Sequence, residues 1–222
     1  MHHRLSAILL CSCLLLPSSA LAARNYDKGL AKATEIITEL GDKVPSVALM
    51  KAECVSVLTI AKGGFIFGAI GGHGFLTCKR KGGGGWSAPV VLKVGGGSVG
   101  FQIGGAKVEL IMVFTDVRDV EDIARATPVF SGGVSATAGD LGAGVSGGGD
   151  PEIEGNVITV SRSQGLYAGA VGEALVIDPD KKETAELLGT TKSLVEVLVK
   201  GTVPVPEKAK TFIAAVRHWH EN

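Results

Sequence analysis

The chain has 222 residues, 45% of them hydrophobic, and its 22 basic residues balance 22 acidic ones. This length suffices for one domain with a sizeable core. A formally neutral chain lacks the excess positive charge with which proteins neutralise nucleic-acid phosphates, so no nucleic-acid partner is expected. The 32 glycines are about twice the usual share, but they separate strongly apolar runs. The composition therefore indicates tight turns and closely approaching strands, and not disorder.

The first 22 residues have the composition of an export signal. A short polar and basic start precedes an apolar stretch over residues 5–16, which is too short to span a bilayer. Ala20-Leu21-Ala22 supplies the small residues that a signal peptidase recognises. We therefore expect a periplasmic or secreted mature chain, 23–222, that forms one domain without a transmembrane span. Leu10-Cys11-Ser12-Cys13 resembles a lipoprotein box, so a lipid anchor at Cys13 is the alternative.

Helical periodicity follows directly after this segment. Apolar residues recur at steps of three and four over residues 25–40, and Gly41 is a plausible stop. Pro45 then opens a second short helical segment that extends to about Glu53.

From Cys54 to Asp178 the hydrophobic pattern is that of strands. The predicted strands, several of them joined by glycine pairs or runs, are 54–61, 64–70, 74–80, 88–94, 98–104, 107–115, 129–138, 156–163, 166–171 and 173–178. A helix is expected over 117–126 and an exposed loop over 139–155. Cys54 and Cys78 either pair in an oxidising compartment or remain separate core residues, and the sequence leaves both readings open.

The last part of the chain is helical again. Ser193 is placed to cap a short helix that ends near Lys200, prolines 204 and 206 break the chain, and residues 207–220 carry an apolar stripe. Helices at both ends of many closely spaced strands predict an α+β fold. Its body should be a glycine-rich antiparallel β barrel or sandwich, flanked by the N- and C-terminal helices.

The sequence contains no evident catalytic constellation, and we expect neither an enzyme nor a bound metal or cofactor. The string G-x-S-x-G occurs around Ser98 and Ser146, but neither serine lies between a strand and a helix as a nucleophile elbow requires. His218 and His220 are two residues apart on a predicted helix, so they point to different faces and do not form a metal-binding pair.

Basic residues are the candidate lipid contacts. Lys79, Arg80 and Lys81 stand beside four glycines at a predicted hairpin tip, and each cation near an anionic membrane contributes about 1 kcal/mol. Lys62 adds a further charge, and Lys28 and Lys32 lie on the first predicted helix. For Lys79, Arg80 and Lys81 the alternative is a solvated turn. For Lys28 and Lys32 the alternative is a helix that packs on the domain's own core.

Six short motifs follow one another along the chain. They are Ala61-Lys62-Gly63-Gly64-Phe65-Ile66-Phe67-Gly68, Gly72-His73-Gly74-Phe75-Leu76, Trp86-Ser87-Ala88-Pro89, Gly100-Phe101-Gln102-Ile103-Gly104, Ser135-Ala136-Thr137-Ala138-Gly139 and Ser161-Arg162-Ser163-Gln164-Gly165-Leu166-Tyr167-Ala168-Gly169. Together they resemble the SYLF domain family over roughly residues 30–190. The resemblance implies a non-enzymatic module that binds anionic, phosphoinositide-containing membranes and, in yeast-type members, actin filaments. An exported member would meet envelope or host lipids, or an extracytoplasmic protein partner.

Overall fold

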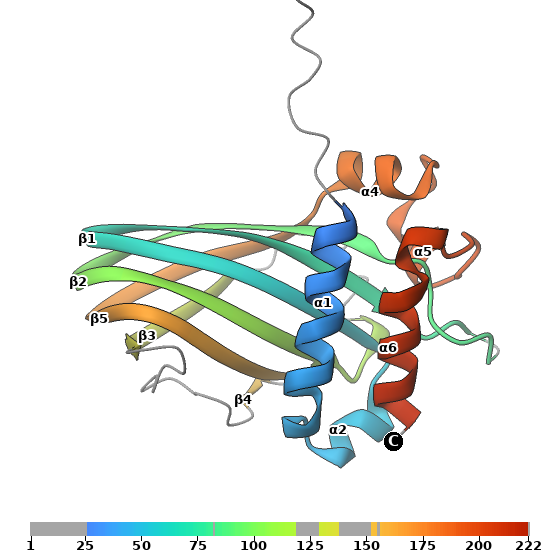
Figure 1. The fold of residues 1–222 in the computed structure, drawn as a ribbon, viewed down its shortest axis with the longest axis horizontal. Helices are drawn as coiled ribbons and strands as arrows, with labels where there is room; N and C mark the ends of the chain where they lie inside the picture. The colour runs from blue at the N-terminus through green and yellow to red at the C-terminus, as the bar shows by residue number, and fades with distance from the viewer. Residues whose placement is uncertain (1–25, 82, 119–128, 138–151, 155, 222) are drawn as a thin grey trace, which may run out of the picture.

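The computed structural model describes residues 26–81, 83–118, 129–137, 152–154 and 156–221 (Figure 1). The elements are α1 (Tyr26–Leu40), η2 (Gly41–Lys43), α2 (Ser46–Lys51), β1 (Cys54–Cys78), β2 (Val90–Phe114), β3 (Val129–Thr137), β4 (Glu152–Glu154), β5 (Val157–Pro179), α4 (Lys181–Leu188), α5 (Leu194–Leu198), η3 (Glu207–Ala209) and α6 (Lys210–Glu221). The expected export signal, most of the expected helix at 117–126 and most of the loop at 139–155 lie outside the described residues. Of that loop, 152–154 form β4.

The strands form one antiparallel sheet in the order β1-β2-β5-β3, with β4 paired to β5. This confirms the expected α+β class with helices at both ends. Within the described residues the sheet does not close into a barrel. Nine of the ten short strands predicted from the sequence merge into three long elements, because the glycines expected to separate them lie inside β1, β2 and β5.

The long strand β1 doubles back on itself at Ile66, which has a positive φ of 65°. Its two ends meet at the Cys54–Cys78 disulfide, where the Cα atoms are 4.0 Å apart. Glycine makes this approach possible: a Cβ atom on Gly74 would lie 2.0 Å from the carbonyl oxygen of Val57, and one on Gly72 would lie 2.4 Å from that of Thr59. β2 and β5 follow the same bend, because each is paired in register along nearly the whole neighbouring strand (Figure 1).

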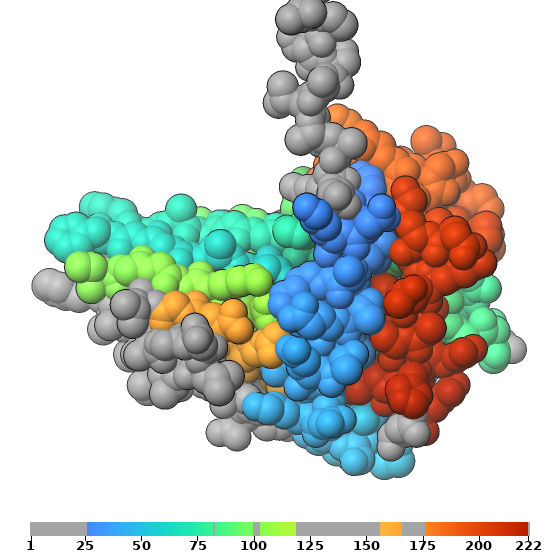
Figure 2. Space-filling view, in the orientation of Figure 1, coloured from blue at the N-terminus to red at the C-terminus, as the bar shows by residue number. Residues whose placement is uncertain are grey.

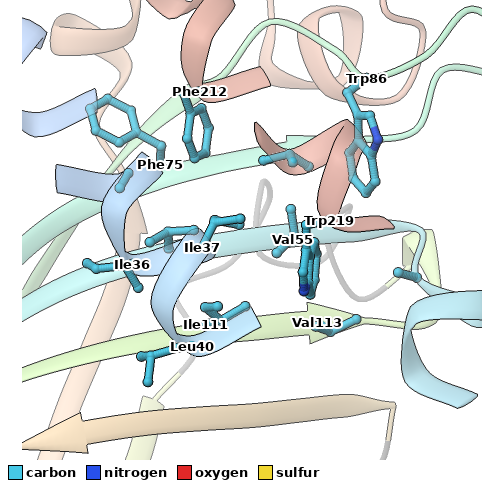
Figure 3. Close-up of a cluster of buried hydrophobic side chains, with 14 of the residues drawn as sticks. Ile36, Ile37, Leu40, Val55, Phe75, Trp86, Ile111, Val113, Phe212 and Trp219 are labelled. Carbon is cyan, nitrogen blue, oxygen red and sulfur yellow. The ribbon is translucent and has the colours of Figure 1, made fainter. Parts of the chain in front are cut away.

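Alternate side chains of the sheet contribute to two hydrophobic cores, as expected for a strand buried on both faces. On one face, Val55 and Ile111 pack beneath α1, α2 and α6, together with Phe75 and Phe212, whose ring centroids are 5.9 Å apart (Figure 3). On the other face, residues of opposite parity such as Leu58 pack with α5. The cysteines of the disulfide also belong to this second core, so the structure decides for pairing, with both residues buried.

The helices cover only one half of the long strands. Burial in β1 ends at Ile60 on the outgoing arm and resumes at Ile70 on the returning arm. Between these positions the sheet projects well beyond α1 and α6 (Figures 1 and 2). From Cys54 to the turn at Ile66 is twelve residues, or about 40 Å of extended strand.

Local signals fix both ends of α4 and the start of α5. The Ser193 side chain accepts from the N–H of Glu196, and the Glu196 side chain accepts in return from the N–H of Ser193, so the expected cap of α5 is a complete capping box. Helix α4 was not expected from the sequence. Its signals were present, since Asp180 caps its start and Gly189, with a φ of 63°, ends it.

Candidate functional site

Large apolar side chains are exposed together where β1 and β2 turn back. Phe65 is 69% exposed and Phe67 74% exposed. Their cross-strand partners on β2, Ile103 and Val99, are also exposed, as is Ile66 at the turn itself. We call these five residues the apolar end. Exposed apolar clusters are a common feature of surfaces that bind a partner or a membrane.

The backbone around the apolar end carries little charge. Residues 61–71 and 95–106 include no acidic residue, and their single charged residue is Lys62. Lys62 is half-buried and lies opposite Ala106 in the register. The acidic position nearest in register is Glu173 of β5, opposite Ser98. The apolar end therefore combines exposed apolar side chains with one cation at its base.

The six cations predicted as lipid contacts lie in three separate places. Lys28 and Lys32 are on α1, Lys62 is at the base of the apolar end, and residues 79–81 form a turn beside α6 at the opposite end of the sheet (Figure 1). Because the apolar end and the turn are separated by the length of the β1 arm, the structure does not gather these residues on one flat face.

Lys32 takes part in a buried network of ion pairs between α1 and the sheet. Its Nζ lies 2.9 Å from Oε1 of Glu109, a carboxylate that is 0% exposed. Lys107 approaches the same oxygen at 2.9 Å, and Nε of Arg162 donates to Oε2 at 2.6 Å. Burial raises the pKa of Glu109, but the hydrogen bonds from the three cations outweigh burial and lower this pKa to about 2. The network holds α1 on the sheet, a role that the sequence pattern does not reveal.

The turn at 79–81 is partly built into the protein. The Arg80 side chain lies against Gly201, whose added Cβ would be 2.7 Å from Cγ of Arg80, and its Nη2 donates to the carbonyl of Val203 at 3.4 Å. Lys79 lies close enough to His220 that its charge, after burial, lowers the pKa of that imidazole. Of the three residues, only Lys81 is exposed. The sequence therefore located the basic turn correctly but did not show what it packs against.

The described residues contain no group of three or more side chains arranged to hold a metal ion. No helix in the same part of the chain has the length and hydrophobicity needed to cross a membrane.

The fold and these surfaces define a class of protein. An open antiparallel sheet, held by terminal helices, presents an exposed apolar end on one side and a cationic turn on the other. Exposed apolar clusters and cationic turns are features through which binding modules contact other molecules, and the architecture is that of an α+β module of this kind.

Comparison with known proteins identifies the family. The family model Ysc84, described as Las17-binding protein actin regulator, matches residues 95–219, more than half of the chain. The chain belongs to this family, the SYLF family, so the resemblance seen in the motifs is confirmed. It is the family of an interaction domain.

Named relatives span animals and yeast. The SH3 domain-containing YSC84-like protein 1 of Rattus norvegicus is 31% identical over 204 residues, which cover 90% of this chain and 59% of the relative. The Homo sapiens protein of the same name is 30% identical over 193 residues, with 85% and 55% covered. Protein YSC84 of Saccharomyces cerevisiae is 26% identical over 173 residues, with 77% and 36% covered. The chain thus matches between about a third and three fifths of these relatives' lengths. No solved structure matches.

Proposed function

We propose that this chain is a non-catalytic module that binds anionic lipid bilayers through the apolar end of its sheet. The observation that carries the proposal is the exposure of Phe65, Phe67, Val99 and Ile103 together at the point farthest from the helices. Fully burying a large apolar side chain contributes about 1.5–3 kcal/mol. Five partly exposed ones therefore supply on the order of 5 kcal/mol when they enter the acyl region.

Lys62 supports the choice of an anionic surface. It lies at the base of the apolar end, where its ammonium group can remain at the level of the head groups while the phenylalanine rings enter the membrane. One cation near anionic lipid adds about 1 kcal/mol. Binding should therefore be driven mainly by apolar burial and should weaken only modestly as salt rises.

Vesicle co-sedimentation tests this proposal. Residues 23–222 are mixed with vesicles of phosphatidylcholine alone or with 20% phosphatidylserine, and Phe65→Ser with Phe67→Ser is compared with Val47→Ser with Met50→Ser. The control residues lie on α2 and are 55% and 74% exposed, so a comparable apolar area is removed elsewhere. We expect the first pair to weaken binding at least tenfold and the control less than twofold. Equal binding by the Phe65/Phe67 variant, or an equal loss in the control, would overturn the proposal.

The basic turn offers a separate comparison on the same vesicles. Changing Lys79, Arg80 and Lys81 to glutamate should leave binding through the apolar end largely intact, because the turn lies at the other end of β1. A strong loss in this triple variant, with Phe65→Ser/Phe67→Ser unaffected, would move the lipid-binding surface to the turn.

A second candidate function comes from the family. The matching family is described as an actin regulator, and an actin-type filament is the protein partner that this description favours. Co-sedimentation of residues 23–222 with filamentous actin, without lipid, tests it. If the chain pellets saturably with actin and binds vesicles of neither composition, the function is binding to a protein partner and not to a membrane.

We also propose that the protein is exported and acts outside the cytoplasm. The buried Cys54–Cys78 disulfide supports this location, because disulfides persist in oxidising compartments. Intact-mass measurement of protein purified from its native host is the test. A chain that begins at Ala23 is expected, a lipid-modified Cys13 would make it anchored, and a chain that begins at Met1 would contradict export.

A further inference from the structure

A cleft with a cationic lining lies at the opposite end of the molecule from the apolar end. It has a volume of about 390 Å³ and is bounded by Arg80 and residues 84–86, by Val205 and by one side of α6. Three of its lining residues are cationic: Arg80, Lys210 and Arg217. Among the described residues that line it, none is acidic.

The α6 side of the cleft follows from helix geometry. Lys210, Ile213, Ala214 and Arg217 are spaced at i, i+3, i+4 and i+7 and therefore form one stripe. The two cations are two turns apart, about 10 Å along the axis, with apolar residues between them. Phe212, Val216 and Trp219 face the core instead and fix which side of α6 is turned outward.

The opposite wall is held in place by packing. Arg80 lies between Gly84 and Gly201, where added Cβ atoms would be 3.4 Å from its Cδ and 2.7 Å from its Cγ. Its main-chain N–H donates to the carbonyl of Gly85 at 2.8 Å. Trp86 is 5% exposed and meets the ring of His220 edge-on, with centroids 5.6 Å apart.

The guanidinium of Arg80 has donor capacity that the protein does not use. Its Nε is buried without a hydrogen-bond partner, and Nη2 has only the 3.4 Å contact to the carbonyl of Val203. Arginine presents a planar array of donors that matches phosphate oxygens. A cleft lined by charges of one sign also concentrates the field on a bound anion.

We propose that this cleft binds a phosphorylated ligand, with Arg80 and Arg217 contacting phosphate oxygens and Trp86 forming the apolar wall. The spacing of the cations along α6 favours a ligand with two phosphate groups over one with a single charge. Glu207 forms an ion pair with Lys210 at the rim, where their side chains are 86% and 62% exposed. Glu207 therefore competes with the ligand for that cation. The ligand is either a free phosphate compound or a lipid head group, since both present the same chemistry.

The experiment uses inorganic pyrophosphate as the probe and Trp86 as the reporter. The chain has two tryptophans, so Trp219→Phe leaves Trp86 as the only source of indole fluorescence. Lys210→Gln with Arg217→Gln is compared with Lys43→Gln and Lys51→Gln, which remove the same charge from residues outside the cleft. Circular dichroism melts verify that each variant is folded, and isothermal titration calorimetry of the chain with both tryptophans repeats the measurement.

We expect pyrophosphate to change the Trp86 fluorescence saturably, and the cleft variant to weaken binding at least tenfold while the matched control changes it less than twofold. Glu207→Gln should tighten binding about two- to fivefold, because it frees Lys210. Equal losses of pyrophosphate affinity in the cleft and control variants would show that only net charge matters and would overturn the proposal. Pyrophosphate affinity that Lys210→Gln/Arg217→Gln leaves unchanged would also overturn it.

Vesicles separate the two sources of phosphate. Phosphatidic acid at 20% in phosphatidylcholine presents a phosphomonoester at a surface, and Phe65→Ser/Phe67→Ser removes the apolar end while leaving the cleft intact. If the double serine variant binds these vesicles and pyrophosphate displaces it from them, the ligand of the cleft is a lipid head group. If the double serine variant binds pyrophosphate but not these vesicles, the ligand of the cleft is a free phosphate compound. Because the two surfaces lie at opposite ends, failure of either proposal leaves the other standing.

Discussion

The two halves of β1 and β2 are continuous strands that differ in what covers them. In the half near the Cys54–Cys78 disulfide, alternate side chains are buried beneath helices on both faces. In the half near Ile66, no described helix covers the sheet and the large apolar side chains are exposed. With binding at the apolar end as proposed, the difference teaches that stability and binding are separated along the same strands. The covered half should carry the free energy of folding, and the uncovered half the contact surface.

The largest effect should come from the ion-pair network in the covered half. Glu109→Gln leaves Lys32, Lys107 and Arg162 without the carboxylate that they surround. Removing one partner of a buried ion pair is strongly destabilising, and we expect a loss of about 3 kcal/mol in the free energy of unfolding. Urea denaturation measures it, with the exposed Glu207→Gln as the control. A loss equal to that of the control would mean that the network does not hold α1.

The same carboxylate makes stability depend on pH. Its pKa in the fold, about 2, lies below its ordinary value of 4.5, so the unfolded chain takes up the proton first as the pH falls. The stabilisation by Glu109 is therefore complete above pH 4.5 and is lost toward about pH 2. The difference in unfolding free energy between wild type and Glu109→Gln should narrow across this range. A difference that stays constant from pH 7 to pH 2 would contradict the assignment.

A smaller loss should follow from separating the two arms of β1. Gly74→Ala places a Cβ atom 2.0 Å from the Val57 carbonyl oxygen, so the arms must move apart. Forcing atoms into a packed site costs about 1–3 kcal/mol. Gly71→Ala is the matched control on the same strand, because its Cβ would meet nothing within 4 Å. Thermal melts of both variants test the comparison, which fails if the two melting temperatures fall equally.

The smallest effect on stability should come from the apolar end. Phe65→Ser with Phe67→Ser removes side chains that are mostly in contact with water, and surface substitutions usually change stability by about 0.5 kcal/mol or less. Unchanged unfolding together with lost vesicle binding would show that the two halves are functionally distinct. If the free energy of unfolding falls by 2 kcal/mol or more, the apolar end is part of the core and the comparison fails.

Sequence patterns located the helices at both ends because their signals are local. The apolar period of α1 and the Ser193-to-Glu196 spacing that caps α5 depend only on neighbouring residues. The α+β class, the antiparallel sheet and the family followed from the same reading and from the motifs. The short helix α4 was missed although Asp180 and Gly189 flank it, because eight residues carry too little periodicity to stand out.

The sequence by itself determined the helices near both ends of the chain, the strand-forming region between them and which cations are candidates for binding. Only the tertiary structure decided that the glycine pairs continue the strands, that Cys54 meets Cys78, and that Lys32 is bound to Glu109. It also decided that Phe65 and Phe67 are exposed, although their apolar character predicts burial, and that Arg80 faces α6. The physical reason is distance along the chain. Burial and charge pairing depend on residues tens of positions away, which the doubled-back sheet brings together and local periodicity does not record.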